Sequence, residues 1–364
     1  MAETASRSEA SGAADPAVAR GTGWPPAERR AGPARLYAAL DLGTNNCRLL
    51  VAEPRGRGFR VVDAFSRIVR LGEGVAASGR LSEPAMARTI EALKICRRKL
   101  TDRRVERARL VATEACRAAA NGDAFIARVR DEAGLELEIV TRETEARLAV
   151  AGCASLVDRV GDGALLFDIG GGSSEIAWID LTRRPSRPGS GLSRSIRAWA
   201  SLPLGVVTLA ERHGGVAVDH DVYEAMVAEV AGHLGRLPEA EALDRAVAAG
   251  RLHLLGTSGT VTTLAGVHLG LERYDRRRVD GLWLDAGDVS AMIERIRGLD
   301  YAGRVASPCI GAERADLVVA GCAILEAIRR RWPCPRLRVA DRGLREGILS
   351  ELIAADRDGP EAAR

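Results

Sequence analysis

Short apolar runs separated by polar turns recur along most of the chain. The first run ends at Asp41, a second covers Cys47–Ala52, and a third lies at Phe59–Phe65. Apolar runs of this length between turn residues are typical of buried strands, so three consecutive strands are predicted. A helix is expected next at 83–100, with Ser82 as its N-cap.

The same order of elements returns in the second part of the chain. Residues 164–168 and 175–180 are apolar runs on either side of a glycine-rich turn, and a third lies at Ala198–Pro203. Alternating strands and helices favour an α/β fold, and the repeat predicts two duplicated units with a cleft between them. The other expected elements are strands at 109–113, 137–141, 253–256 and 337–340, and helices from about 123, 144 and 260, at 220–235, at 312–331 and at 344–354.

We expect the chain to divide into four segments. Residues 1–34 are rich in Ala, Gly, Pro and Ser and show no period, which predicts a disordered tail. Residues 35–147 and 148–341 are expected to form the two domains, and 342–364 a C-terminal helix that packs back on the first domain. The segment 182–194, rich in Pro, Gly, Ser and Arg, is expected to be an exposed loop.

Composition narrows the class of protein. Apolar residues make up 46% of the chain, which excludes wholesale disorder. The length of 364 residues is sufficient for two domains of moderate size. The seven cysteines form no CxxC pair and no zinc-ligand pattern, so we expect reduced thiols in a cytoplasmic protein. No signal peptide and no apolar stretch long enough for a membrane span is expected.

The small positive net charge is weak evidence for an anionic substrate or partner. The formal net charge is +4, and Lys94 and Lys99 are the only lysines, so almost all positive charge is arginine. Arginine binds phosphate oxygens bidentately, which suits a polyanionic substrate, although genomic base composition explains most of these arginines.

The glycine-rich turn in the second unit is the first candidate for a functional site. Glycine lacks the Cβ that keeps backbone N–H groups away from a phosphate, and carboxylates beside a phosphate suggest a hard cation such as Mg²⁺ between them. A plain β-turn between two strands is the alternative interpretation. The residues of this turn are Asp168, Gly170, Gly171, Gly172, Ser173 and Glu175.

Two further turns share this pattern. Each follows an apolar strand, and the third leads into a helix N-terminus, where the backbone favours an anion. Asp41 and Asp168 both end buried strands, which costs free energy unless the carboxylate is paired or binds a metal. The candidate phosphate-binding residues of these turns are Gly43, Thr44 and Asn45 in the first and Gly256, Ser258 and Gly259 in the third.

Several stretches resemble, in order, the exopolyphosphatase and guanosine pentaphosphatase (Ppx/GppA) family of the actin-like phosphotransferase superfamily. They are AALDLGTNNCRLLVA, VATEACRAAANGDAF, TRETEARLAVAGC, LLFDIGGGSSEIA, SLPLGVV, LLGTSGTVTTLA and LRVADRGLREGIL, which together cover about residues 36–352. The resemblance implies two actin-like (ribonuclease H-like) domains. This chain resembles the short form of the family, which lacks a C-terminal helical domain, and it departs from the family pattern at 308–311.

The resemblance also implies roles for individual residues. Glu145 matches the general base that deprotonates the attacking water, and Arg117 matches an arginine of the cleft. Asp41, Asp168 and Glu175 match acidic positions near the divalent cation, Mg²⁺. Read without the resemblance, Glu145 complements a helix dipole and Arg117 lies on a helix surface.

The third turn and the histidines also have simpler interpretations. The alternative interpretation of Thr257 and Ser258 is that they simply cap the helix that follows them. No histidine lies in a glycine-rich motif, so each is interpreted as structural or surface; these are His213, His220, His233, His253 and His268.

The function expected from these features is an exopolyphosphatase that releases orthophosphate from the end of inorganic polyphosphate. The alternative on the same scaffold removes the terminal phosphate of guanosine pentaphosphate. Two other classes are an actin-like nucleotide-binding filament or chaperone protein and a sugar kinase. No membrane or sequence-specific nucleic-acid partner is expected, and the resemblance alone suggests a homodimer.

Overall fold

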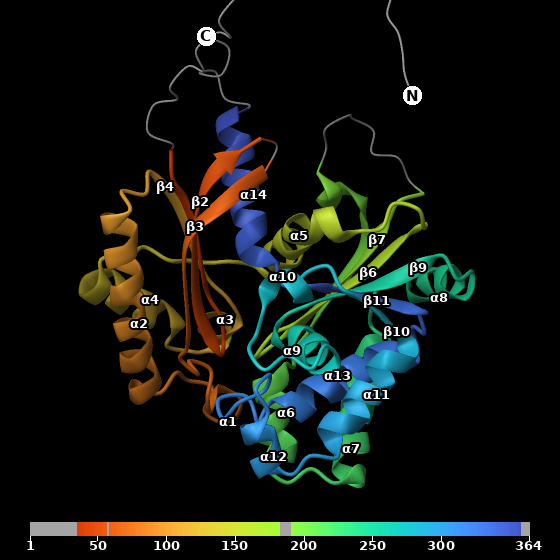
Figure 1. Cartoon of the computed structure of the whole chain (residues 1–364). Helices are drawn as coiled ribbons and strands as arrows, with labels where there is room; N and C mark the ends of the chain where they lie inside the picture. Colours follow the sequence, from red (N-terminus) through yellow and green to blue (C-terminus); the bar gives the residue numbers. More distant parts are fainter. Residues whose placement is uncertain (1–34, 57, 183–190, 358–364) are drawn as a thin grey trace, which may run out of the picture. The chain divides into compact units, whose positions relative to one another are not determined.

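Two β-sheets form the framework of the protein (Figure 1). The computed structural model describes residues 35–56, 58–182 and 191–357, so the expected tail at 1–34 and most of the expected loop at 182–194 lie outside the described residues. The strands of the first sheet are β1 (Tyr37–Leu42), β2 (Asn46–Arg55), β3 (Gly58–Ile68), β4 (Arg107–Ala112) and β5 (Glu138–Ile139). Those of the second are β6 (Gly163–Ile169), β7 (Ser174–Asp180), β8 (Ile196–Leu202), β9 (Leu252–Thr257), β10 (Trp283–Asp285) and β11 (Arg336–Ala340).

The two sheets share one topology. The first has the order β3-β2-β1-β4-β5, and the second contains the equivalent order β8-β7-β6-β9-β11, with β10 added antiparallel to β11. In both, the central strand pairs antiparallel with the next strand along the chain and parallel with the fourth. The repeat of five strands confirms the predicted duplicated α/β fold.

Helices cover the faces of both sheets. The longer ones are α2 (Glu83–Asp102), α4 (Gly122–Ala133), α5 (Arg142–Cys153), α6 (Val206–His213), α7 (His220–Leu234), α8 (Ala240–Ala248), α9 (Gly259–His268), α11 (Ala286–Arg297), α13 (Val318–Arg331) and α14 (Leu344–Arg357). The shorter ones are α1 (Val75–Ser78), α3 (Glu114–Ala118), α10 (Arg276–Val279), α12 (Tyr301–Ala306) and the 3₁₀ turns η1 (Ala154–Leu156) and η2 (Leu192–Ser195). No helix in the described part of the chain is long and apolar enough to cross a membrane.

Alternation along β1 divides the core of the first sheet into two. Ala38, Leu40 and Leu42 pack with apolar residues of α2 and α4, which cover the outer face (Figure 1). Tyr37 and Ala39 point to the opposite face and pack with apolar residues of α14. Successive side chains of a strand alternate between faces, so Asp41, two residues beyond Ala39, belongs to the α14 face.

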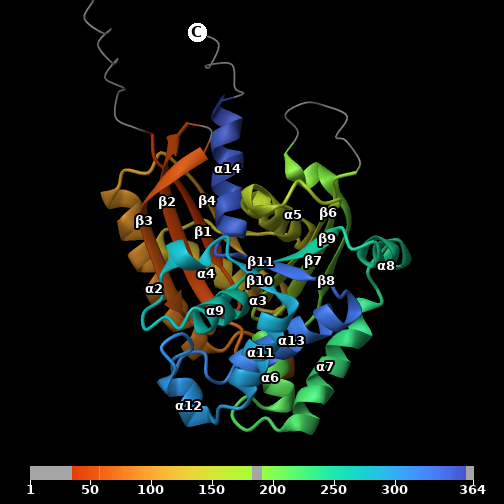
Figure 2. The ribbon, with the colours of Figure 1, turned by 45° about the vertical axis from the view of Figure 1, so that its right-hand side comes forward.

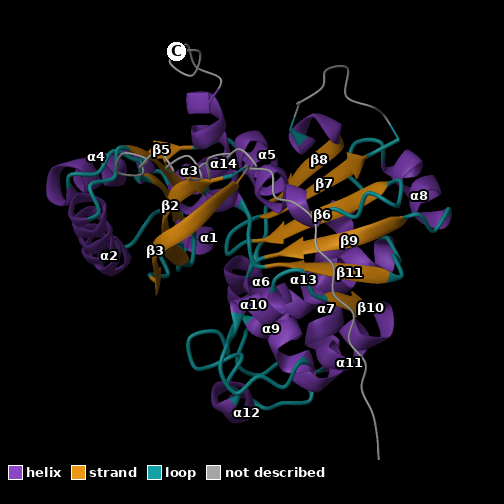
Figure 3. Ribbon diagram, turned by 45° about the horizontal axis from the view of Figure 1, so that its top comes forward, coloured by secondary structure: helices purple, strands orange, loops and turns teal. Residues whose placement is uncertain are grey.

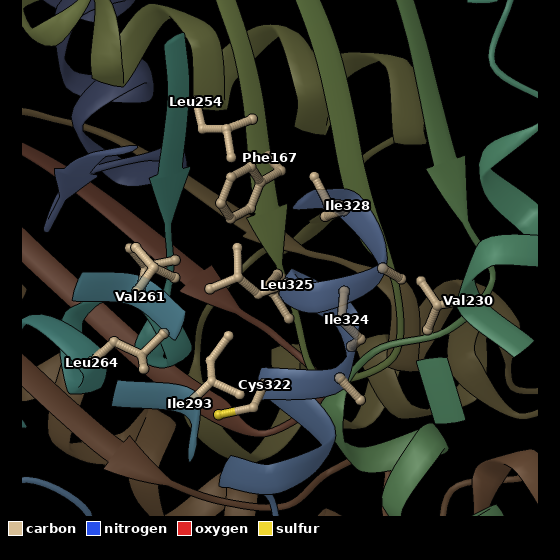
Figure 4. Close-up of a cluster of buried hydrophobic side chains, with 14 of the residues drawn as sticks. Phe167, Val230, Leu254, Val261, Leu264, Ile293, Cys322, Ile324, Leu325 and Ile328 are labelled. Atoms are coloured by element: carbon tan, nitrogen blue, oxygen red, sulfur yellow. The ribbon is translucent and has the colours of Figure 1, made fainter. Parts of the chain in front are cut away.

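The second sheet is divided in the same way. Leu165 and Phe167 join a large core formed with α6, α7, α9, α11 and α13, part of which Figure 4 shows around Phe167 and Leu325. Ala164 and Leu166 face the other way and pack with apolar residues of α5. Asp168 comes two positions after Leu166 and therefore faces α5.

The helices α5 and α14 lie side by side between the two sheets (Figures 2 and 3). Glycines allow the close contact: a Cβ on Gly152 would lie 1.9 Å from the carbonyl oxygen of Gly343, and one on Gly347 would lie 2.1 Å from that of Leu148. One sheet packs on α14 and the other on α5. The faces of β1 and β6 that carry Asp41 and Asp168 therefore both point towards this central pair of helices.

Two expected helices begin elsewhere. The helix expected from Thr144 begins at Arg142, with the Thr141 side chain as its N-cap. The helix expected at 312–331 begins only at Val318. Arg70 donates hydrogen bonds to the Asp316 carboxylate and to the carbonyl of Glu313, so contacts with the first half hold the preceding residues in turns.

Candidate active site

A cavity of about 130 Å³ lies where the turns after β1 and β6 meet the N-terminal ends of α5 and α9. Most of the residues expected to form the site line it. They are Asp41, Gly43, Thr44, Asn45, Glu145, Asp168, Gly170, Gly171, Gly172, Ser173, Glu175, Ser258 and Gly259.

Two expected residues, Arg117 and Gly256, do not line this cavity. Gly256 is buried in β9, where a Cβ would lie 2.6 Å from the ring of Phe167 and 2.8 Å from Val261, so its small size serves packing. Arg117 lies next to the cavity, within hydrogen-bond distance of Glu145.

Both strand–turn–strand hairpins present unpaired backbone N–H groups. In the described part of the chain, the N–H groups of Thr44, Asn45, Gly171, Gly172 and Ser173 donate no hydrogen bond within the protein. Buried N–H groups almost always have a partner, because leaving one unpaired costs free energy. Five donors from two facing turns therefore form a site for an anion with several oxygens.

The two turns touch each other. A Cβ on Gly171 would lie 2.9 Å from the Cβ of Thr44, and one on Gly172 would lie 2.8 Å from the Thr44 hydroxyl oxygen. Only glycine allows this approach. The first turn has more room, since a Cβ on Gly43 would meet nothing closer than the Asn46 carbonyl oxygen at 3.5 Å.

The third turn adds a strained serine. Ser258 has a φ of 97°, a conformation that favours glycine, and its buried hydroxyl has no hydrogen-bond partner in the described residues. The Asn45 side-chain oxygen Oδ1 is likewise buried and unpaired there. Strained residues and unpaired polar atoms in a cavity indicate groups that are arranged for a ligand.

Five carboxylates line the cavity, namely Asp41, Glu114, Glu145, Asp168 and Glu175. Burial raises the pKa of Asp168 to about 6 and that of Glu175 to about 7, and repulsion from neighbouring carboxylates adds to both shifts. Burial also raises the pKa of Asp41, opposed by Arg48 and Arg345, and raises that of Glu145 well above its usual range, with Glu175 adding to the effect. Each shift has the same physical cause, namely negative charge confined in a poorly solvated space.

These carboxylates fit a hard divalent cation that also binds phosphate. No group of three or more His, Cys, Asp or Glu side chains in the described ranges is arranged to hold a metal by itself. Magnesium in phosphate-binding sites typically has one or two protein carboxylates and completes its shell with phosphate oxygens and water. Asp41 and Asp168, each the last residue but one of the equivalent strands β1 and β6, are suitable ligands of that kind, and a cation would relieve their mutual repulsion.

Glu145 lies in the first turn of α5 and its side chain is 12% exposed. Arg117 donates a hydrogen bond of 3.1 Å from Nη2 to Oε2 of Glu145. The other carboxylate oxygen, Oε1, has no hydrogen bond in the described part of the chain and belongs to a residue that lines the cavity. A carboxylate with one oxygen held and one free is suited to accept a proton from a bound water.

Two arginines of the site were not expected from the sequence. Arg48 and Arg314 line the cavity together with the turns. Arg48 is paired with Asp41 across the β1–β2 ladder, so strand alternation from Asn46 could have indicated it. Arg314 belongs to the turns before α13, and no periodic pattern marks it.

A second, larger cavity of about 840 Å³ continues from the first. The two share Asp41, Arg48, Asp168, Ser258, Gly259, Arg314 and Leu344. The larger cavity is also lined by three arginines, Arg276, Arg342 and Arg345, and by three carboxylates, Glu313, Asp341 and Glu346. Arg276 forms ion pairs with Asp341 and Glu346.

The model of the Ppx/GppA phosphatase family matches residues 50–355. The chain belongs to the Ppx/GppA phosphatase family. Exopolyphosphatase 2 of Mycobacterium tuberculosis is 31% identical over 333 residues, covering 86% of this chain and 98% of that protein. The guanosine-5'-triphosphate,3'-diphosphate pyrophosphatase of Aeromonas salmonicida is 30% identical, and the match covers 89% of this chain but only 60% of that longer protein.

Solved structures of Ppx/GppA proteins have the same fold. A crystal structure of an exopolyphosphatase-like protein superposes with a TM-score of 0.76 at 26% identity, covering 88% of this chain and 99% of that one. The Aquifex aeolicus member of the Ppx/GppA family has a TM-score of 0.67 at 27% identity, covering 90% and 100% of the two chains.

Proposed function

We propose that this Ppx/GppA protein is an exopolyphosphatase that hydrolyses the terminal phosphoanhydride bond of inorganic polyphosphate and releases orthophosphate. The observation that carries this proposal is the set of five backbone N–H groups that have no hydrogen bond among the described residues and belong to residues lining one small cavity together with Glu145. The larger cavity that continues from it has room for more of the chain, and Arg48 and Arg314, which line both cavities, can bind phosphate oxygens. The similarity to a protein named exopolyphosphatase 2 over nearly its full length supports the same reaction.

In this mechanism the terminal phosphate accepts hydrogen bonds from the two turns. Glu145 takes a proton from a water molecule through its free oxygen, and the water oxygen attacks the terminal phosphorus. The bond from phosphorus to the bridging oxygen then breaks, and the shortened chain remains in the larger cavity. Preorganised donors around the transferred group lower the barrier because they stabilise its charge without rearranging.

We assign Mg²⁺ as the cofactor, which Asp41 and Asp168 would bind directly, with Glu175 as the acidic residue near it. When bound, it would neutralise negative charge on the phosphates and on these carboxylates. Ser201 donates a hydrogen bond of 2.8 Å to Glu175 and fixes the orientation of that side chain. We also place the protein in the cytoplasm, where its seven free thiols would stay reduced.

Guanosine pentaphosphate is the second candidate substrate, because two pyrophosphatases named for that nucleotide are also similar to this chain. Both substrates offer a terminal phosphoanhydride to the same turns. An actin-like nucleotide-binding protein is the alternative of another class.

Phosphate release from long-chain polyphosphate, guanosine pentaphosphate and ATP, each with and without Mg²⁺, tests these proposals. We expect the highest kcat/KM on polyphosphate and loss of activity when a chelator removes the cation. Release from the nucleotide alone would reverse the order of the two substrates. Nucleotide-dependent polymerisation without turnover of any of the three compounds would refute the hydrolase.

A further inference from the structure

Glu114 is a buried carboxylate of the cavity to which the proposed mechanism assigns no role. It begins α3 directly after β4, is only 8% exposed, and lines the cavity. A charged side chain is rarely buried to this extent unless it is paired, because removal from water is costly. Its partners therefore indicate its purpose.

Two arginines from different elements bind this carboxylate. Arg142, the first residue of α5, donates from Nη2 to Oε1 at 2.7 Å and from Nε to Oε2 at 3.2 Å. Arg117, on the same short helix as Glu114, donates from Nε at 3.0 Å and also from Nη2. Glu114 thus joins α3 to the N-terminal end of α5, three residues before Glu145.

Arg117 also binds two groups besides Glu114. Nη1 donates to the carbonyl of Val140 at 2.6 Å, and Nη2 makes the single hydrogen bond to Glu145. An arginine that met an isolated carboxylate would form two parallel hydrogen bonds with it. Because Glu114 occupies the Nε side of the guanidinium, Arg117 reaches Glu145 with only one donor.

We propose that Glu114 is a positioning residue that holds Arg117 and Arg142 so that Arg117 binds one oxygen of Glu145 and leaves the other free for the attacking water. This inference rests on the proposed function, in which Glu145 is the general base. Without Glu114, the fork of Arg117 would turn towards Glu145 and engage both of its oxygens, which removes the proton acceptor from the site.

Glu114 also has a fixed relation to the second turn. A Cβ on Gly172 would lie 3.2 Å from Cγ of Glu114, so the carboxylate stem packs directly against that turn. The position of the base and the position of the phosphate-binding turn are therefore set from the same side chain.

Glu114→Gln tests the proposal, because glutamine keeps the shape of the side chain and removes the charge that attracts the two arginines. We expect kcat on polyphosphate to fall roughly 10- to 100-fold, as for a misplaced catalytic group, while KM changes by less than about threefold. Glu351→Gln is the matched control. Glu351 of α14 pairs with Arg147 of α5, the helix that also carries Arg142, but it lines neither cavity, so kcat should remain unchanged. An unchanged kcat in Glu114→Gln, or an equal loss in the control, would overturn the proposal.

A double variant separates this inference from the proposed function. If Glu114 acts through Glu145, Glu114→Gln lowers kcat no further once Glu145→Gln is present. Independent losses that multiply would overturn the positioning role while leaving Glu145 as the base. A fully active Glu145→Gln enzyme would instead refute the base itself.

Arg142→Gln provides a second variant if Glu114→Gln fails to fold. The Arg142 side chain is 43% exposed, so its loss should be tolerated by the fold. Since Arg117 still holds Glu114, we expect a smaller loss, roughly three- to tenfold in kcat with KM maintained. Wild-type kcat in Arg142→Gln would overturn the proposal.

Discussion

The turn between β1 and β2 and the turn between β6 and β7 occupy equivalent places in two duplicated sheets, yet they contribute different chemistry. The first presents side chains: Thr44 and Asn45 are buried in the cavity wall. The second consists mainly of glycines, which present backbone groups, and adds the single side chain of Ser173. Duplication has preserved the carboxylate that ends each central strand and has changed the turn residues after it.

The anchoring of the two turns also differs. The carbonyls of Thr44 and Asn45 accept hydrogen bonds from Gly72, Val69 and Arg70 of the same half. The carbonyls of Gly170 and Gly171 instead accept from Val206 and Val207 at the N-terminal end of α6. In both turns these carbonyls accept hydrogen bonds, while N–H groups of the turn have no partner among the described residues. Two different neighbouring segments thus hold the two turns in conformations that leave N–H donors available for an anion.

Glu145 belongs to neither turn, and replacing it has the largest expected effect. Glu145→Gln should lower kcat roughly 10²- to 10⁴-fold, because glutamine cannot accept the proton from water. Single-turnover phosphate release measures this loss. Thermal unfolding serves as the control and should be nearly unchanged. Persistent activity would mean that the two turns carry the catalysis without a base.

A matched pair of alanine variants tests the turns against each other. Gly171→Ala places a methyl group against Thr44 and should separate the turns, lowering kcat/KM roughly 100-fold. Gly43→Ala meets only ordinary contacts and should stay within about threefold of wild type. Both are measured on polyphosphate with saturating Mg²⁺. Equal losses in the two variants would show that the close approach of the second turn has no special importance.

The strands behind the turns differ between the two halves as well. Arg107 of β4 and His253 of β9 lie at equivalent positions, four residues before the partners of Asp41 and Asp168 in their ladders. Arg107 is exposed, whereas His253 is 5% exposed and lies edge-on to Trp283. Burial lowers the pKa of His253 to about 4.

This difference predicts a pH dependence that belongs to the second half alone. Between about pH 6.5 and pH 4 the unfolded chain binds a proton at His253 and the folded chain does not, so stability falls as the pH falls through that window. The full effect is about 3 kcal/mol. Denaturant unfolding of wild type and His253→Gln at pH 7 and pH 5 measures it. The carboxylates with raised pKa make the free energy of unfolding change with pH in the opposite direction, but they do so equally in wild type and in His253→Gln. The difference in unfolding free energy between the two proteins therefore reports on the histidine alone. A difference that is the same at pH 7 and pH 5 would contradict the prediction.

Replacing Ser258, in the third turn, has a smaller expected effect on stability than replacing His253. Ser258→Gly relieves the positive φ and removes an unpaired buried hydroxyl, so the variant should be more stable by about 1 kcal/mol. The hydroxyl would be lost as a phosphate donor, so KM should rise while the melting temperature also rises. A variant with reduced stability would mean that the hydroxyl already has a partner in solution.

The sequence was sufficient to predict the two hairpins and most of the cavity wall, because the apolar runs before Asp41 and Asp168 fix both the strands and the places where they end. It did not indicate how Arg117 is used. The Arg117 side chain donates hydrogen bonds to Glu114, to the Val140 carbonyl and to Glu145, and no local sequence pattern predicts these three partners. Similarly, Arg314 is placed by the pairing of Arg70 with Asp316 across the two halves, a contact between residues 246 positions apart.

The position of α14 has a consequence for synthesis of the protein. This helix covers the face of the first sheet that carries Tyr37 and Ala39, and Asp356 at its end accepts a hydrogen bond from the Tyr37 hydroxyl. The strands of that sheet are complete once Ile139 has been made, 218 residues before Arg357. At typical elongation rates, roughly 10 to 45 s would pass between the synthesis of Ile139 and that of the end of α14. During that interval we expect this apolar face of the nascent chain to bind chaperones, because α14 has not yet been made to cover it.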